Sequence, residues 1–246
     1  MCYYVATSFS AEDIIQLEHD FVLHWAEEDY GQYFCVSGFA HPNLPIITGE
    51  NILAMQWGLV PSWVKDEDTA KKLRIQTLNA QSETVDSKPS FRSAVKAGRM
   101  GILPVKGFFE WQHHENGNKY PYFIYPTHNR FFYLATIFET WLNPTTQAPI
   151  SSFSILTTAA NERMQVIHNT KQRMPLILET EAAKQWIDPT LPFAEKQHLL
   201  KAFGTEGMKD HTISRLITSR KENPNQPAVL EYHAYPEIEG TQGTLF

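Results

Sequence analysis

The sequence predicts one α+β domain built on a mainly antiparallel, curved or barrel-like β-sheet with a few peripheral helices. Segments with the composition of strands outnumber those with helical periodicity, and several strands follow one another through turns too short to hold a crossover helix. Of the 246 residues, 42% are hydrophobic and 13% aromatic, which is typical of a packed globular chain. We expect the domain to span residues 1–222, followed by a segment, 223–246, that packs partly on it and ends in about a dozen loose residues.

In the first half of the chain, one amphipathic helix precedes a run of short strands. Residues 10–21 are predicted to be helical because Ser10 stands shortly before Asp13, as in a capping box, and apolar residues recur on one face. Gly and Pro break the apolar runs that follow into short pieces. The expected strands of this half are 33–38, 44–48 and 52–61, and the expected surface helices are 66–74 and 90–97.

The second half is dominated by apolar and aromatic strands. Residues 100–112 are apolar enough for one buried strand, and the Asn116-Gly117 pair marks a tight hairpin into the next strand. Short helices are expected where apolar residues recur at helical spacing. The expected strands after the hairpin are 119–125, 130–141, 152–160 and 173–178, and the expected helices are 161–167, 180–187 and 193–203.

Charge and hydropathy exclude several classes of protein. The net charge of −6 argues against a general nucleic-acid binder, although residues 87–109 hold five basic residues and no acid and so predict a local positive face. A solvated helix followed by a strand is the alternative interpretation of this basic stretch. No apolar run approaches a membrane span and no secretory signal begins the chain, so we expect a cytoplasmic protein with no membrane partner, and a monomer.

The two cysteines require separate explanations, because two thiols make neither a disulfide framework nor a zinc motif. Cys35 fits a strand residue that faces the core. Cys2 is one proteolytic step from being the first residue, and an N-terminal cysteine carries an α-amine beside its thiol. The amine adds to an aldehyde to give an imine, and the thiol can then close a five-membered thiazolidine ring. Cys2 is therefore a candidate covalent nucleophile for aldehydes.

Three further segments place polar side chains in apolar surroundings. Asn79 lies among strand-like residues, where the alternative is a turn-forming amide at a strand end. Glu110 lies between two aromatic residues; in an apolar pocket its pKa would be raised toward neutrality, whereas an outward-facing Glu would have no such role. His168 and Arg173 are a candidate proton carrier and phosphate anchor, although a lone His is more often structural.

Several segments together resemble the SRAP family, whose name means SOS-response-associated peptidase and whose members shield abasic sites in DNA. They appear in the family's order from residue 1 to about residue 190, and AVLEY at 228–232 is also similar. The segments are MC at the start, WGLVPSW at 57–63, LNAQSET at 78–84, FRSAV at 91–95, GILPVKGFFEW at 101–111, SILTTAAN at 154–161 and IHNTKQRMPLIL at 167–178.

The resemblance implies a covalent shield for abasic sites in single-stranded DNA that needs no metal or other cofactor. Cys2 would condense with the ring-opened aldehyde to a thiazolidine, and Asn79 would orient the Cys2 amine. Glu110 would shuttle protons during ring opening and imine formation, and His168 would assist at the sugar and its 3′ side. Because the same imine can lead to β-elimination, weak lyase activity is also implied.

The DNA-binding residues are expected to be aromatic and basic. Trp63 is the candidate wedge that stacks beside the lesion, with core packing as its alternative. Arg92, Lys106 and Arg173 are the candidate phosphate contacts, together with Gln81 at a position where the family usually has Arg.

Two features of this chain depart from the family's usual pattern. Gln81 and Tyr4 stand where members usually carry Arg, and two such contacts would be worth about 1.5 to 3 kcal/mol each in DNA binding. The segment between His168 and Arg173 is also two residues longer than in the shorter family form, and Lys171 within it could supply part of the lost charge.

Three other functions remain open from the sequence. Cys2 could serve a thiol peptidase or autoprotease, the chain could be a non-catalytic module that binds damaged or single-stranded DNA, or it could act on another aldehyde. The crosslinking hypothesis requires the fold to bring Cys2 beside Asn79, Glu110 and His168.

Overall fold

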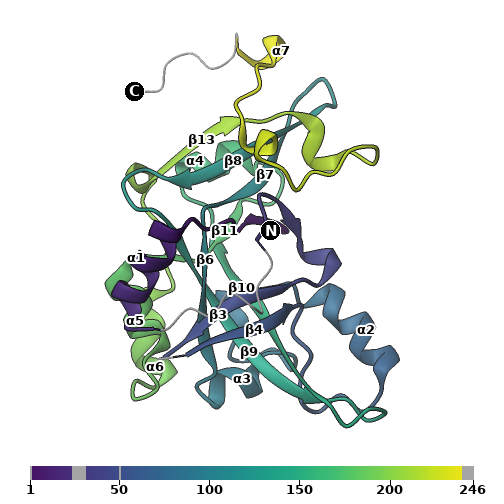
Figure 1. Cartoon of the computed structure of the whole chain (residues 1–246), viewed down its shortest axis with the longest axis vertical. Helices are drawn as coiled ribbons and strands as arrows, with labels where there is room; N and C mark the ends of the chain where they lie inside the picture. The colour runs from purple at the N-terminus through teal and green to yellow at the C-terminus, as the bar shows by residue number, and fades with distance from the viewer. Residues whose placement is uncertain (1, 24–31, 50, 240–246) are drawn as a thin grey trace.

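The computed structural model describes residues 2–23, 32–49 and 51–239 and contains two β-sheets that stand one above the other in Figure 1. In the larger sheet β9 pairs with β6 and β10, and β10 pairs with β9 and β4, so five strands close in the order β10–β4–β3–β6–β9. The expected barrel-like and mainly antiparallel sheet is confirmed. The barrel strands are β3 (Asn43–Thr48), β4 (Asn51–Trp57), β6 (Met100–Val105), β9 (Phe132–Leu142) and β10 (Pro149–Ala159).

Three short strands extend the barrel along β10 and β9. β5 (Asn79–Gln81) runs parallel to β10, and β11 (Arg173–Pro175) runs antiparallel to it. β12 (Ile177–Leu178) pairs instead with β9, so the expected single strand over 173–178 is two strands. The chain divides at Leu176, whose backbone bonds to both Leu156 and Ala135.

The second sheet has the order β13–β8–β7–β1–β2 and lies at the top of Figure 1. Its strands are β1 (Tyr4–Ala6), β2 (Val36–Ser37), β7 (Gly107–His113), β8 (Lys119–Pro126) and β13 (Met208–Thr212). The expected single strand over 100–112 is wrong, because the chain leaves the barrel at Lys106 and enters this sheet as β7. Gly107 permits the transition, since a Cβ there would collide with the Phe123 ring and the Ile124 carbonyl oxygen.

All six expected helices are present, and most of them lie at the margins of the barrel (Figure 1). Ser10 accepts from the Asp13 backbone and the Asp13 carboxylate accepts from the Ser10 backbone, which confirms the capping box of the first helix. The expected helix over 193–203 stops early and continues as a 3-10 turn over Gln197–Leu199. The helices are α1 (Ala11–Phe21), α2 (Glu67–Gln76), α3 (Arg92–Lys96), α4 (Glu162–Ile167), α5 (Thr180–Ile187), α6 (Phe193–Lys196) and α7 (Pro236–Glu239).

Other boundaries also differ from those expected. The expected strand over 52–61 ends at Trp57 because Gly58, with φ of 113°, turns the chain in a region that favours glycine. The expected strand over 33–38 is reduced to β2, and Cys35 lies buried just before it. Strand β13 was not expected.

The C-terminal segment is packed as far as the structure describes it. Val229, Tyr235 and Ile238 are buried, so packing extends into the last dozen residues, which we expected to be loose. Residues 240–246 lie outside the described residues. Among the described residues, no helix has the length and apolar character needed to cross a membrane.

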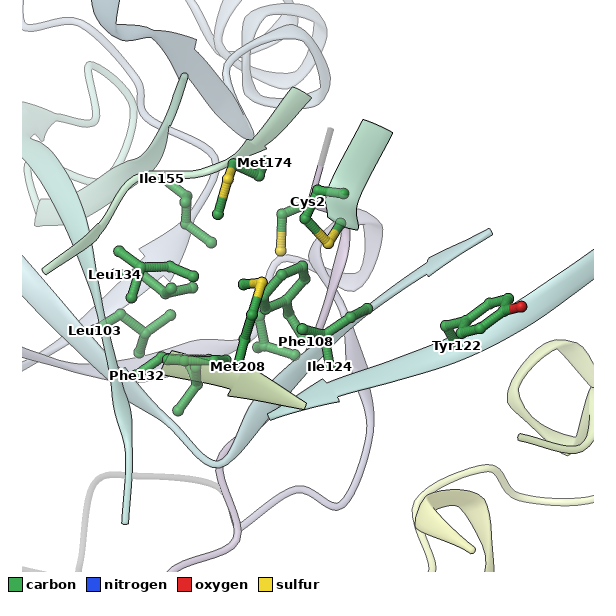
Figure 2. Packing of buried hydrophobic residues seen from close by; sticks show 14 of the residues in the cluster. Cys2, Leu103, Phe108, Tyr122, Ile124, Phe132, Leu134, Ile155, Met174 and Met208 are labelled. Carbon is green, nitrogen blue, oxygen red and sulfur yellow. The ribbon is translucent and has the colours of Figure 1, made fainter. Parts of the chain in front are cut away.

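The main hydrophobic core fills the space between the barrel and the second sheet, and Cys2 belongs to it. Figure 2 shows Cys2 grouped with Phe108 of β7 and Met174 of β11, above Leu134 of the barrel. Cys2 has no exposed surface. Cys2 is thus placed where the two sheets meet.

Candidate active site

Cys2 is fixed by contacts on both sides of its backbone. It lies two residues before Tyr4, the first residue of β1, which pairs with Phe109 of β7. The Asn79 amide nitrogen donates to the Cys2 carbonyl oxygen at 2.9 Å, and the Cys2 thiol lies 3.8 Å from the Tyr4 carbonyl oxygen. Asn79 therefore does contact Cys2, although through the carbonyl group rather than the nitrogen. The other amide atom, Asn79 Oδ1, is buried and has no hydrogen-bond partner among the described residues.

Glu110 faces the core from the middle of β7. Alternation along the strand places it on the same face as Phe108, and only 4% of its surface is exposed, which excludes the outward-facing alternative. Burial raises the pKa of its carboxyl to about 7, as expected for a carboxyl in apolar surroundings. Near neutral pH, Glu110 is therefore able both to donate and to accept a proton.

His168 lies at the C-terminal end of α4 with its ring fixed by a backbone carbonyl. Its Nδ1 is 2.7 Å from the Arg173 carbonyl oxygen, and because a carbonyl can only accept, Nδ1 carries the proton. Nε2 of the neutral ring is then an acceptor, and it lies 3.8 Å from Glu110 Oε2. Burial lowers the pKa of His168 to about 4, so the imidazole is neutral at physiological pH.

The thiol of Cys2 is protonated in this environment. Burial, and next the negative charge of Glu110, raise its pKa above the ordinary value. A thiol that is not ionised needs a base when it attacks, and a neutral imidazole and a half-ionised carboxyl lie in the same site. The structure thus brings together Cys2, Asn79, Glu110 and His168, which the crosslinking hypothesis requires.

A cavity of about 460 Å³ opens beside Glu110 and His168. Tyr4, which stands at a position where the SRAP family usually has Arg, packs edge-on against Trp111 at its border, with ring centroids 5.2 Å apart. Lys171, from the longer segment after His168, also lines it. The cavity is lined by Tyr3, Tyr4, Glu110, Trp111, His113, Lys119, His168, Thr170 and Lys171.

A second hollow, of about 310 Å³, lies on the Asn79 side of the site. Asn79, Gln81 and Lys88 line it. Trp63 borders the same segment, since its indole nitrogen donates to the Pro89 carbonyl oxygen at 3.3 Å. Half of Trp63 is exposed, which excludes full core packing and leaves its ring free to contact a ligand. Arg92 is exposed at the start of α3, close in sequence to this hollow.

The other two basic candidates are engaged by carboxylates. Lys106 Nζ lies 3.0 and 3.1 Å from the oxygens of Asp13, on α1. The guanidinium of Arg173 binds both carboxylate oxygens of Glu83, at 2.7 and 2.9 Å. The sequence did not indicate Glu83 as a site residue, and the only signal was its place two positions after Gln81 in the LNAQSET segment.

The basic stretch 87–109 does not form one positive face. Arg99 pairs with the buried Glu139 of β9, and Lys106 pairs with Asp13. The exposed positive charge is therefore carried by the remaining three residues, Lys88, Arg92 and Lys96. Among the described residues, no group of three or more His, Cys, Asp or Glu side chains is arranged to hold a metal ion.

Comparison with known proteins gives consistent matches over most of the chain. A family model described as SOS response associated peptidase (SRAP) matches residues 1–220. The abasic site processing protein YoqW of Bacillus subtilis is 32% identical over 213 residues, covering 81% of this chain and 90% of YoqW. The abasic site processing protein HMCES of Gallus gallus is 31% identical over 211 residues, covering 77% of this chain and 61% of HMCES. A crystal structure of a Bacteroides thetaiotaomicron protein has a TM-score of 0.86 at 34% identity, covering 95% of this chain and 100% of the other.

Proposed function

The chain belongs to the SRAP family, and from this membership we propose that it processes abasic sites in single-stranded DNA by forming a covalent thiazolidine with Cys2. The observation that carries the proposal is the contact of residue 2 with Asn79, together with Glu110 and His168 facing one another beside it. A 1,2-aminothiol is the group that captures an aldehyde durably, and these neighbours are able to move its protons.

Once residue 2 is N-terminal, the proposed reaction first forms an imine and then closes it to a thiazolidine. The Cys2 amine adds to the aldehyde carbon of the ring-opened sugar, and the resulting carbinolamine loses water to form an imine. The thiol then adds across the C=N bond, so that sulfur bonds to carbon and the thiol proton ends on nitrogen. One water leaves in total and no oxidant or reductant is consumed. Elimination of the 3′ phosphate from the same imine would give the lyase activity.

Glu110 and His168 are assigned different parts of the proton transfer. The protonated carboxyl of Glu110 donates to the hydroxyl that leaves the carbinolamine, because its pKa of about 7 keeps much of it protonated near neutrality. The Nε2 acceptor of His168 favours removal of a proton from the sugar hydroxyl or the thiol. Both side chains are largely buried, which limits the access of bulk water to these protons.

We place the DNA strand along the hollow that Asn79, Gln81 and Lys88 line. Trp63 would stack on a base beside the lesion, and Arg92 and Lys88 would contact phosphates. This arrangement uses the exposed basic residues of the 87–109 stretch and leaves Lys106 in its ion pair with Asp13.

A crosslinking assay tests the proposal. Protein trimmed of Met1 is incubated with single-stranded oligonucleotides with and without an abasic site, and adducts that survive heating are resolved on a denaturing gel. We expect an adduct with abasic DNA only, which Cys2→Ala abolishes and Cys35→Ala, a change at the other buried thiol, leaves intact. An adduct with Cys2→Ala would show that the nucleophile is wrong, and peptide cleavage without an adduct would favour a peptidase.

A further inference from the structure

Arg173 connects the segment that carries His168 with the segment that carries Asn79. Its backbone carbonyl accepts from His168 Nδ1 at 2.7 Å, and its side chain binds Glu83 through both terminal nitrogens. Glu83 follows directly after the strand that carries Asn79. One residue therefore contacts the imidazole through its main chain and the Asn79 segment through its side chain.

Both terminal nitrogens of the Arg173 guanidinium are engaged, and its Nε, which has no hydrogen-bond partner among the described residues, is buried away from an incoming anion. Besides the two bonds to Glu83, its Nη2 donates to the Thr157 carbonyl oxygen at 2.6 Å and lies 3.2 Å from the Thr157 hydroxyl. The Arg173 side chain is 16% exposed, whereas Glu83 is 48% exposed. A DNA phosphate would have to displace a bidentate carboxylate, the geometry in which Arg binds anions most strongly.

The ion pair crosses a barrel strand. β5 and β11 lie on opposite sides of β10, in register at Thr157 with Gln81 and at Ala159 with Arg173. Glu83 reaches from the end of β5 over Thr157 to Arg173 on β11. The pair thus fixes the separation between the segment that orients Cys2 and the segment that carries His168.

The loop between His168 and Arg173 gives an independent reason why Arg173 must be held. Gln172 has φ of 50°, a left-handed conformation that costs energy for a residue other than Gly, Asn or Asp. Its backbone nitrogen donates to the His168 carbonyl oxygen at 2.9 Å, and its own carbonyl accepts from Ala160. A strained loop of this kind keeps its geometry only while its ends are fixed, and Arg173 is one of those ends.

We propose that Glu83 is a positioning residue for the Cys2 site, which holds Arg173 so that the Arg173 carbonyl fixes the orientation and tautomer of His168. This inference rests on the proposed function for its kinetic test but not for its spectroscopic one. Arg173 accordingly serves the geometry of the site through its main-chain carbonyl group.

The test compares Glu83→Gln and Glu83→Ala with the unaltered protein. Glu181→Gln is the control, because it breaks a different surface ion pair, the one between Glu181 and Lys184 at 2.7 Å. Crosslinking rate at saturating abasic oligonucleotide and the dissociation constant for the same oligonucleotide without the lesion are measured separately. For Glu83→Ala we expect a rate reduced about tenfold with an unchanged or tighter dissociation constant. The double exchange Glu83→Arg with Arg173→Glu should recover part of the rate.

Nitrogen-15 NMR of the histidine rings supplies a readout that needs no activity. His168 is assigned by comparison with His168→Asn, and in the unaltered protein we expect a single neutral tautomer with the proton on Nδ1. Glu83→Ala should mix the two tautomers, and Glu181→Gln should not. An unchanged His168 spectrum in Glu83→Ala, or weaker DNA binding at an unchanged rate, would overturn the proposal. Absence of crosslinking by the unaltered protein would refute the proposed function, while the NMR result would still decide the role of Glu83.

Discussion

Replacing Glu110 by glutamine should expose a pH dependence of stability that the unaltered chain conceals. In the folded protein, burial holds the pKa of Glu110 at about 7, against an ordinary value of 4.5. Burial holds the pKa of His168 at about 4, against an ordinary value of 6.5. The two groups thus differ from their unfolded values by about 2.5 pH units each, in opposite directions.

The two displacements act on the free energy of unfolding with opposite signs. Between pH 4.5 and 7, folded Glu110 keeps a proton that the unfolded chain has released, so stability falls as the pH rises. Between pH 4 and 6.5, unfolded His168 holds a proton that the folded ring lacks, so stability rises with pH. At about 1.36 kcal/mol per pH unit, each change amounts to about 3 kcal/mol.

Over the shared interval, pH 4.5 to 6.5, the two contributions of the unaltered protein cancel. Glu110→Gln keeps only the His168 contribution, and its stability should rise by about 3 kcal/mol from pH 4 to 6.5. His168→Asn, which retains a donor toward the Arg173 carbonyl, should lose about 3 kcal/mol from pH 4.5 to 7. For a domain of this length such a change corresponds to about 6–12 °C in melting temperature.

The assay is urea unfolding followed by circular dichroism at half-unit steps from pH 4 to 8. The double variant Glu110→Gln with His168→Asn measures the dependence of all other groups, and its profile is subtracted from the others. If Glu110→Gln and the unaltered protein give parallel profiles after that subtraction, then Glu110 does not carry the raised pKa and the assignment of its role in proton transfer fails.

Three further changes test the proposed DNA-binding surface and the packing. Trp63→Ala should lower the free energy of unfolding by less than about 1 kcal/mol, because half of the side chain is exposed. It should weaken the binding of single-stranded oligonucleotides, measured by fluorescence anisotropy, by about 1–3 kcal/mol. Unchanged binding would show that Trp63 does not contact the DNA. Arg99→Met leaves the buried carboxylate of Glu139 without its ion-pair partner. The free energy of unfolding, measured by urea denaturation, should fall by about 3 kcal/mol, and a loss below about 1 kcal/mol would contradict the pairing. Ser10→Ala removes the hydroxyl that caps α1 at Asp13, for an expected loss of about 1 kcal/mol measured by thermal unfolding, which Ser10→Asp should largely restore.

Elements set by local interactions were predictable from the sequence. The capping box of α1 and the tight turn at Asn116-Gly117 depend on neighbouring residues, and both lie where expected. The division of the apolar run 100–112 was not predictable in this way. Whether the chain continues in one sheet or enters a second depends on the close approach of Gly107 to the Phe123 ring on another strand.

The candidate site was also only partly predictable: its unusual residues stand out in the sequence, but ion-pair partners that are distant in sequence do not. Cys2, Asn79, Glu110 and His168 were identified because each is an unusual residue type for its surroundings and matches a family motif. The ion pairs of the two basic candidates could not be predicted from the sequence. Lys106 is bound by an acidic residue 93 positions away in the chain, and Arg173 is bound by one 90 positions away. Counting charges within a window of sequence cannot reveal carboxylates that only the fold brings close.

Because Cys2 is completely buried, its position tolerates little change in the size or charge of the sulfur. Oxidation of the sulfur to a sulfinic acid would introduce two oxygens and a negative charge into a space with no contact with solvent. Such a copy would lose the close packing around Cys2 where the two sheets meet. It would therefore open more often than an intact copy, and cellular proteases that act on unfolded chains would remove it first.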